Sequence, residues 1–280
     1  MSSDIYRQAG AEGFSRERHG PWAVIAGASD GLGAEFARHA AAAGIHCILI
    51  ARRLPALQAL AGELTERFGV QAMPVSIDLS SADATEKMLA TIGDREIGLL
   101  VFNAGADTSG KRFLDLPLAE WSVLTSRNVN TFMSTCHALG ERMLKRGHGG
   151  MLLVSSTASF GGGARVGMYT ATKAFGLNLG ESLWAELAPH NVDVLNLVFA
   201  TASTPTFKGV LEKHGIPLDS VGAVPTPEQI AAAAVAAIRR GPTLIFDGDD
   251  TGSDPFRSSV LRRQRVEGVS QYMNGFYGES

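Results

Sequence analysis

The sequence predicts an α/β protein with a doubly wound parallel sheet, folded as a single domain with a C-terminal helical tail. Two observations predict it. Short apolar runs alternate with longer segments of helical periodicity, which is the order of a parallel sheet covered on both faces. The first apolar run also leads directly into a glycine-rich turn and an alanine-rich helix. We expect the domain to span residues 21–250, after an N-terminal arm at 1–20 and before a tail at 251–280.

The charge balance favours a small-molecule partner over a macromolecule. The 280 residues include 28 acidic and 25 basic side chains, and the pI is about 6.2, which gives no basic surface for nucleic acid or an anionic membrane. No apolar run reaches the ~18 residues of a membrane span, and the charged first twenty residues do not have the pattern of a signal peptide. We expect a cytoplasmic protein with no membrane and no nucleic-acid partner.

The two cysteines, Cys47 and Cys136, lie in apolar patterns that are typical of buried free thiols in a reducing compartment. No group of Cys and His residues has the spacing of metal ligands, so the sequence predicts no metal site.

A candidate phosphate site joins the predicted strand at 22–26 to the helix at 34–43. Backbone N–H groups at a helix start attract a pyrophosphate, and glycines let it approach the backbone. The spacing is G-x-x-x-G-x-G rather than the commonest dinucleotide fingerprint, but the position between a strand and a helix favours a binding site over a plain turn. The candidate residues are Gly27, Ser29, Asp30, Gly31, Leu32 and Gly33.

The second predicted strand, at 45–50, ends in two arginines. An acidic residue about twenty positions after the glycine turn would hydrogen-bond the ribose 2′-hydroxyl of NAD. Arg52 instead offers a charged donor fork that suits a 2′-phosphate. With Arg53 beside it, the sequence favours NADPH (NADP+) over NADH. Asp30 argues against this preference if it points inward, and two solvated arginines capping a strand are the alternative.

The remaining segments complete the predicted sheet and its helices. Strands are expected at 71–75, 97–102, 150–155, 192–198 and 243–246, and helices at 55–68, 117–146, 168–188 and from Pro225 onward. Two strand ends add candidates to the cofactor site. Asp78, with Leu79, either accepts from an adenine amino group or caps a helix that starts near Ser81. The strand at 97–102 ends in small residues that let it approach a cofactor closely; they are Asn103, Ala104 and Gly105.

Three side chains around one cleft form the candidate catalytic centre. Tyr169 and Lys173 share a helix face at i and i+4, and a nearby ammonium favours the phenolate, which makes Tyr169 a usable proton donor and acceptor. Ser156 lies at a strand end thirteen residues earlier. Asn128 is a fourth candidate, because an unpaired amide on an apolar helix face would cost about 1–3 kcal/mol. A water or backbone contact that distorts the helix is the alternative to a catalytic role.

These residues stand in the order and spacing of the short-chain dehydrogenase/reductase family, which the chain resembles over residues 20–250. The resemblance rests on the glycine motif, the Asn-Ala-Gly triplet, Asn128, Ser156, Tyr169 and Lys173. It implies a Rossmann-type fold. Thr204 matches a Thr that commonly reaches the nicotinamide amide, whereas Phe199-Ala200 stands where the family usually carries Pro-Gly. The tail and the Gly20-Pro-Trp22 entry are similar to a branch that includes the bacterial 7β-hydroxysteroid dehydrogenases.

The resemblance implies a role for each residue. Tyr169 is expected to donate a proton to the forming alkoxide, and Ser156 to hydrogen-bond the oxyanion. Lys173 is expected to hold the ribose hydroxyls, beside Tyr169 in the cofactor site, and to lower the pKa of Tyr169. Asn128 is expected to anchor a water that links Lys173 to solvent. The implied activity is NADPH-dependent interconversion of a ketone and a secondary alcohol; an NAD-linked alcohol dehydrogenase of catabolism and a non-catalytic dinucleotide-binding regulator are the alternatives.

A bulky, apolar substrate is expected, either steroid-like or a long acyl 3-ketone. A candidate lid near 200–222 carries or adjoins the apolar residues Phe199, Phe207, Val210, Leu211 and Ile216. The resemblance also implies a homodimer or homotetramer through the helices at 117–146 and 168–188. The tail aromatics Tyr272, Phe276 and Tyr277, with Met273 among them, are expected to pack or to make an oligomer contact rather than to border the substrate.

Overall fold

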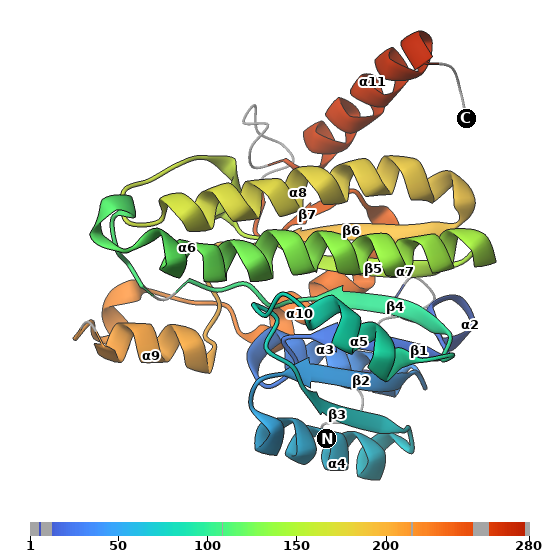
Figure 1. Ribbon diagram of the computed structural model, residues 1–280, viewed down its shortest axis with the longest axis horizontal. Helices are drawn as coiled ribbons and strands as arrows, with labels where there is room; N and C mark the ends of the chain where they lie inside the picture. Colours follow the sequence, from blue (N-terminus) through green and yellow to red (C-terminus); the bar gives the residue numbers. More distant parts are fainter. Residues whose placement is uncertain (1–5, 7–12, 108, 214, 249–257, 278–280) are drawn as a thin grey trace.

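Seven strands form one sheet in the order β3-β2-β1-β4-β5-β6-β7, and every neighbouring pair is parallel (Figure 1). The computed structural model describes Tyr6 and residues 13–107, 109–213, 215–248 and 258–277; the side chains of 218, 270 and 272–277 are not described. The strands are β1 (Trp22–Ala26), β2 (His46–Ala51), β3 (Ala72–Ser76), β4 (Ile97–Phe102), β5 (Gly149–Val154), β6 (Val192–Val198) and β7 (Thr243–Ile245). The predicted doubly wound parallel sheet is confirmed.

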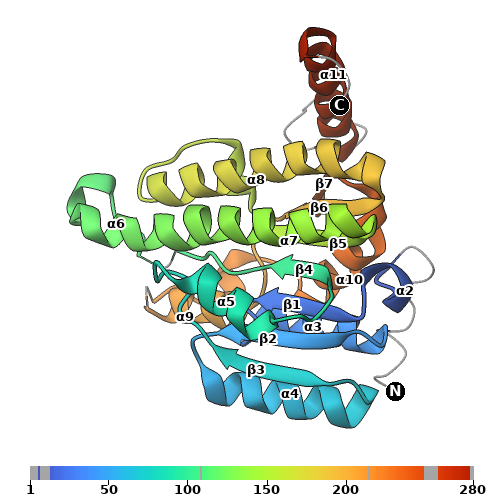
Figure 2. The same cartoon turned by 45° about the vertical axis from the view of Figure 1, so that its right-hand side comes forward.

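Helices cover both faces of this sheet (Figures 1 and 2). One apolar layer packs α3, α4 and α10 against the strands, and the other packs α5, α7 and α8. The helices are α2 (Arg16–His19), α3 (Gly31–Ala42), α4 (Leu54–Phe68), α5 (Ala84–Ile92), α6 (Leu118–Thr125), α7 (Phe132–Arg146), α8 (Gly167–Leu187), α9 (Pro205–Lys213), α10 (Pro227–Ala237) and α11 (Ser259–Tyr277).

The central strands are buried on both faces, as the continuous apolar runs of β1 and β4 require. Both cysteines are free and buried: Cys47 lies in the layer of α3, and Cys136 in the layer of α7. Burial raises the pKa of each thiol to about 12. They are packing residues of the core.

The strand order reverses between β1 and β4, and this reversal positions the site. In an open parallel sheet a ligand crevice forms beyond the carboxyl ends of the two strands at such a point. The carbonyl of Ala26 accepts from the amides of Asn103, at 2.9 Å, and Ala104, at 3.1 Å. The glycine turn after β1 and the triplet after β4 are therefore fixed side by side.

Three helix boundaries differ from the prediction. Helix α3 begins at Gly31, within the glycine turn, rather than at 34. Helix α5 begins at Ala84 with Asp83 as its N-cap residue, because residues 78–81 form a turn of their own. The long helix expected at 117–146 is interrupted by a π-helical segment at Ser126–Thr131.

The candidate lid forms α9, followed by a 3-10 turn at Leu218–Val221. The tail forms α11, which extends away from the rest of the molecule in both views (Figures 1 and 2). Its first turns are anchored where Arg262 donates to the buried Glu181 carboxylate, at 2.7 Å. The expected role of the tail aromatics falls on side chains outside the described part.

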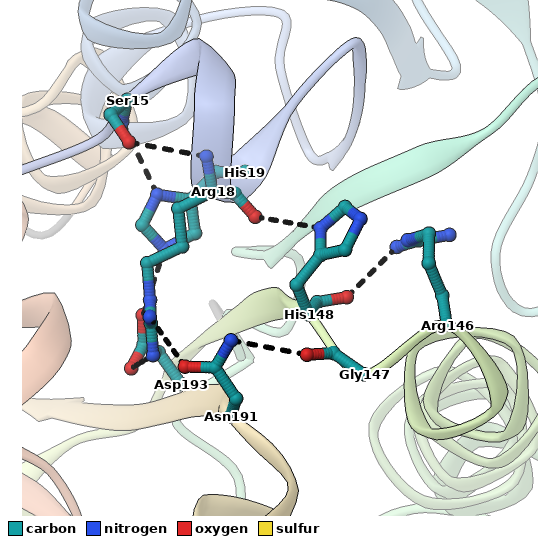
Figure 3. Close-up of polar contacts among 8 residues, drawn as sticks. All are labelled: Ser15, Arg18, His19, Arg146, Gly147, His148, Asn191 and Asp193. Carbon is teal, nitrogen blue, oxygen red and sulfur yellow. Dashed lines mark hydrogen bonds and ion pairs between the residues drawn. The ribbon is translucent and has the colours of Figure 1, made fainter.

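Helix α2 packs beneath the amino ends of the strands. Its His19 is fully buried, and a Cβ at Gly98 or Gly150 would come within 2.8 Å of this segment. Asp193 of β6 pairs with Arg18 and lies 3.1 Å from Nε2 of His19 (Figure 3). This part of the predicted N-terminal arm is thus packed against the sheet. No helix of the described residues is long and apolar enough to cross a membrane.

Candidate active site

A cavity of about 710 Å³ lies at the crevice between β1 and β4. It is walled by the glycine turn, by the ends of β2, β3 and β4, by α6 and by the start of α9. Its lining includes the predicted cofactor residues Gly27, Ser29, Asp30, Arg52, Arg53, Asp78, Leu79, Asn103, Ala104 and Gly105. The structure therefore brings together residues that the sequence places on four separate strand ends.

The glycine turn is shaped by close backbone contacts. Gly27 has φ +88°, and a Cβ there would lie 2.8 Å from the amide nitrogen of Ala104. A Cβ at Gly33 would lie 2.0 Å from the carbonyl oxygen of Gly27. Gly31 has φ +52° and faces the side chain of Thr204. These contacts leave backbone N–H groups at the start of α3 open to a ligand, which fits the pyrophosphate of a dinucleotide.

The two arginines after β2 have different partners. Arg53 donates to the carboxylate of Asp30 and to the hydroxyl of Ser29, the latter at 3.0 Å. The negative charge of Asp30 is thereby compensated within the turn. Arg52 lines the cavity, and its side chain makes no ion pair with the described residues. Of these two arginines, Arg52 is thus left for a ligand.

Asp78 does not cap a helix. Its carboxylate accepts from the amide of Ser80, at 3.0 Å, and from the Ser80 hydroxyl, at 2.7 Å. These bonds, with more distant help from Arg52, hold the pKa of Asp78 below its ordinary value. Capping of a helix near Ser81 is therefore wrong, because the carboxylate is engaged in a local turn that precedes α5; an adenine contact stays a prediction.

Asn128 lies in the π-helical segment, where such distortions frequently mark functional sites. Its Nδ2 donates to the carbonyl of Gly105, at 3.2 Å, and to the hydroxyl of Thr172, at 3.0 Å. Its Oδ1 accepts from Nε of Arg127, at 3.1 Å. The buried amide is satisfied on both sides, and it is tied to the helix that carries Tyr169 and Lys173.

Lys173 projects from α8 toward the end of β5 and is 8% exposed. Its Nζ donates to the carbonyl of Val154, at 2.9 Å, and lies 5.9 Å from the centre of the Tyr169 ring. A Cβ at Gly105 would lie 3.1 Å from this Nζ. Because Gly105 lines the large cavity, the ammonium lies directly behind the cavity wall. Ser156 follows β5 and accepts from the amide of Ala158, at 3.2 Å.

The pKa shifts differ from the sequence-based expectation for Tyr169. Burial raises the pKa of this phenol, a hydrogen bond with Ser156 lowers it, and Asp107 raises it further. Burial and the charge of Arg127 lower the pKa of Lys173 to about 8. The structure does not show the expected lowering of the Tyr169 pKa by Lys173, because burial dominates and the ammonium is turned toward a backbone carbonyl.

A second, much smaller cavity of about 20 Å³ lies behind Lys173 and Asn128, which is room for one water. Ser155 and Asn196 also line it, and Oδ1 of the fully buried Asn196 has no hydrogen-bond partner among the described residues. Sequence reasoning missed Arg127, Ser155 and Asn196. A charged or amide residue inside an apolar helix or strand pattern was the signal available for Arg127 and Asn196; Ser155, a small hydroxyl directly after β5, gave no such signal.

The structure places the apolar lid residues and Thr204 differently from what their predicted roles require. None of the five apolar lid candidates is among the residues that line the large cavity; α9 contributes Pro205, Thr206 and Lys213. Leu211 is buried, whereas Ile216 is exposed. The hydroxyl of Thr204 accepts from the amide of Phe207, at 3.1 Å, so it stabilises the first turn of α9. Its expected contact with a nicotinamide amide stays a prediction.

The family model for short chain dehydrogenases matches residues 21–215. The chain therefore belongs to the short-chain dehydrogenase family, and it is an NAD(P)-dependent oxidoreductase. The predicted family resemblance is confirmed.

Named relatives are similar over most of the chain. A very-long-chain 3-oxoacyl-CoA reductase of Laccaria bicolor is 29% identical over 249 residues, which are 87% of this chain and 71% of the relative. A 7β-hydroxysteroid dehydrogenase of Collinsella aerofaciens is 31% identical over 191 residues, covering 68% and 72%. Among solved structures, a 7β-hydroxysteroid dehydrogenase has a TM-score of 0.78 at 26% identity, covering 90% of this chain and 98% of that one. A short-chain dehydrogenase from Sphingobium yanoikuyae in complex with NADPH has a TM-score of 0.75 at 26% identity, covering 91% and 95%.

Proposed function

We propose that the protein is an NADPH-dependent reductase of a bulky, apolar ketone, with Tyr169 as the general acid. The observation that carries this proposal is the position of Lys173 and Asn128 directly behind Gly105 in the wall of the large cavity. A ligand that extends from the glycine turn to Gly105 would meet the predicted catalytic residues at its far end.

The donor set supports NADPH over NADH. Arg53 compensates Asp30, which removes the repulsion that this carboxylate would exert on a 2′-phosphate. Arg52 remains at the mouth of the same cavity as an always-charged donor. An NADPH complex is also named for the Sphingobium yanoikuyae dehydrogenase. Gly27, Asp78, Asn103 and Thr204 would complete the cofactor site.

The chemistry of each side chain follows from its surroundings. A bound reduced nicotinamide supplies the hydride. Tyr169 is protonated at neutral pH, as an ordinary phenol is, and burial raises its pKa further, so it would deliver a proton to the oxygen of the ketone. Ser156 would donate a hydrogen bond to that oxygen as it gains charge. Lys173 would hold ribose hydroxyls, and the one-water cavity beside Asn128 would supply its proton contact.

The substrate class rests on relatives and on the cavity wall. The named relatives are reductases of very long 3-oxoacyl chains and dehydrogenases of 7β-hydroxysteroids. Leu116, Trp121 and Leu124 give the large cavity an apolar side. Steroid-like ketones and long acyl 3-ketones are therefore the two substrate groups to test. A homodimer or homotetramer through the segment 117–146, which holds α6 and α7, and through α8 is part of the same proposal, as is a location in the cytoplasm.

The test is the loss of absorbance at the reduced-nicotinamide band when the purified protein meets a panel of bulky ketones, with NADPH and separately with NADH. We expect turnover with NADPH and at least one bulky ketone. Turnover only with NAD+ and an alcohol would favour a catabolic dehydrogenase. Tight NADPH binding without turnover on any ketone or alcohol would favour a regulator.

A further inference from the structure

Arg127 lies where the large cavity meets Asn128, a predicted catalytic residue. It precedes Asn128 in the π-helical segment and lines the cavity together with Arg52 and Asp78. Its Nε donates to Oδ1 of Asn128, at 3.1 Å, and a terminal nitrogen donates to the carbonyl of Ala106, at 2.7 Å. The guanidinium is therefore held in one orientation from two sides.

The charge of this guanidinium is not matched by a carboxylate. Within the described part of the chain Arg127 makes no ion pair; Asp78 and Asp107 act on it only from a distance. Burial, and then repulsion by Arg52, lower its pKa. A half-buried cation without a carboxylate partner lowers the stability of a fold unless a ligand supplies negative charge.

The donor count shows where such an acceptor belongs. A guanidinium carries five N–H donors in a plane, and two of them are used by Asn128 and Ala106. The described residues provide no partner for the other three. Because Arg127 is part of the cavity lining, these donors are available to a molecule that fills the cavity beside Arg52 and Asp78.

We propose that Arg127 is a cofactor-contacting residue that binds phosphate or ribose oxygens of the adenosine half of the dinucleotide and so couples cofactor binding to the position of Asn128. This inference rests on the proposed function. One edge of the guanidinium holds Oδ1 of Asn128, whose Nδ2 reaches Gly105 and Thr172. A ligand on the opposite edge fixes the whole chain of contacts, up to the helix that carries Lys173.

Calorimetric titration with NADPH tests the contact in three variants. Arg127→Met is expected to raise the Kd on the order of 10- to 100-fold, the loss of a charge-assisted hydrogen bond. Arg127→Lys keeps the charge but has no Nε for Asn128. It is expected to recover most of the affinity while kcat stays reduced. Adenosine 2′,5′-bisphosphate and nicotinamide mononucleotide, as separate ligands, locate the contact: only the former is expected to lose affinity in Arg127→Met.

The control is Arg146, another half-buried arginine, which lies at the amino end of the sheet, donates to the carbonyls of Ile97 and His148, and has the carboxylate of Glu96 at 3.6 Å. Arg146→Met is expected to lower the melting temperature and leave the Kd for NADPH unchanged. Arg127→Met is expected to change the ligand-free melting temperature little, because relief of the unmatched charge offsets the lost hydrogen bond to Oδ1 of Asn128, and to show a smaller rise on adding NADPH. The ligand-free melting curve also shows that the variant is folded.

Three results would overturn the inference. Equal NADPH affinity in wild type and Arg127→Met removes the contact while leaving the proposed function intact. A lower ligand-free melting temperature in Arg127→Met, with an unchanged NADPH-induced rise, makes Arg127 a structural residue. Failure of the wild-type protein to bind NADPH, NADH or their oxidised forms ends both the proposed function and this inference.

Discussion

The two ends of the sheet carry similar kinds of polar side chains and use them in opposite ways. At the amino end, Arg18, His19 and Asp193 are hydrogen-bonded to one another and to the backbone around them (Figure 3). At the carboxyl end, Arg52 and Arg127 face a cavity of about 710 Å³ without an ion-pair partner in the described residues. The chemical groups are alike, but only one set is complete without a ligand.

The amino-end network shows what completeness requires. Asp193 accepts two hydrogen bonds from Arg18 and a third from Nε2 of His19, whose Nδ1 accepts from the amide of Ser15. The tautomer of the buried imidazole is fixed by these two contacts. Burial alone would raise the pKa of Asp193, but the hydrogen bonds from His19 and Arg18 outweigh it and lower the pKa.

The polar groups at the amino end of the sheet therefore serve stability, whereas those at the carboxyl end are suited to binding a ligand. A polar group whose partners are all in the protein stabilises the fold, and removal of one partner leaves another buried group unpaired. A polar group that waits for a ligand contributes little to the fold or destabilises it. Substitutions at the two ends should therefore change different measured quantities.

The largest effect is expected for Tyr169→Phe. Loss of the phenolic proton donor should lower kcat for ketone reduction on the order of 10²- to 10⁴-fold. The Kd for NADPH and the melting temperature should stay near the wild-type values, because the ring and its packing are kept. Steady-state assays measure kcat, and titration and scanning calorimetry on the same preparation measure the Kd and the melting temperature. A matching loss of NADPH affinity would make Tyr169 structural and would break the contrast.

The next effect is expected at the amino end, for Asp193→Asn. An amide cannot accept from both nitrogens of Arg18 and from His19, so the free energy of unfolding should fall by about 1–3 kcal/mol. Steady-state kinetic constants should be unchanged. Urea unfolding at pH 7 measures the loss, and Glu141→Gln, which breaks the exposed pair with Lys145 on α7, is the control expected to leave the midpoint in place.

The pH dependence of this loss of stability tests whether the charge of Asp193 causes it. Because the pKa of Asp193 is lowered in the folded state, its stabilisation is present above the ordinary carboxylate pKa and disappears as the pH falls through the folded value. The difference in the free energy of unfolding between wild type and Asp193→Asn should therefore become smaller in acid. A gap that is constant down to low pH would mean that the charge of Asp193 is not what stabilises the fold.

A smaller effect is expected for Arg52→Asp, which should shift cofactor preference toward NADH. We expect the ratio of kcat/KM for NADPH to that for NADH to fall by about tenfold or more, since an exposed charge-assisted contact is lost and a repulsion is gained. Lys145→Asp makes the same charge change at the far end of α7 and should leave the ratio unchanged. An unaltered ratio in Arg52→Asp would remove Arg52 from the 2′-phosphate site.

The sequence was sufficient where a pattern is local. The glycine turn sits between an apolar run and a helix, and Tyr169 and Lys173 are separated by one helical turn, so both features follow from spacing. The alternation of apolar runs with helical periodicity was sufficient for the parallel sheet. The strand order and its reversal at β1 and β4 are visible only in the structure.

The missed features all depend on contacts between segments far apart in the chain. Nothing near Asp30 in the sequence indicates that Arg53, twenty-three positions later, compensates it. Asn196 faces the cavity behind Lys173 only because β6 pairs with β5. Arg127 belongs to no spacing motif, and its orientation follows from a π-helical segment that helical periodicity does not signal.

The smallest effect is expected in the pH profile. Burial and the charge of Arg127 lower the pKa of Lys173 to about 8, while burial keeps Tyr169 protonated well above neutral pH. As the pH rises through about 8, Lys173 loses the charge with which it would hold the cofactor, although Tyr169 still carries its proton. We therefore expect kcat/KM for ketone reduction to be level up to that point and then to decline by about tenfold per pH unit.

In Arg127→Met one cause of the lowered Lys173 pKa is removed, so the decline should begin at higher pH. Initial rates across the range in both proteins measure the shift. A decline at the same pH in the two proteins would mean that Arg127 does not influence Lys173, and a decline only near the ordinary pKa of a phenol would assign it to Tyr169 instead.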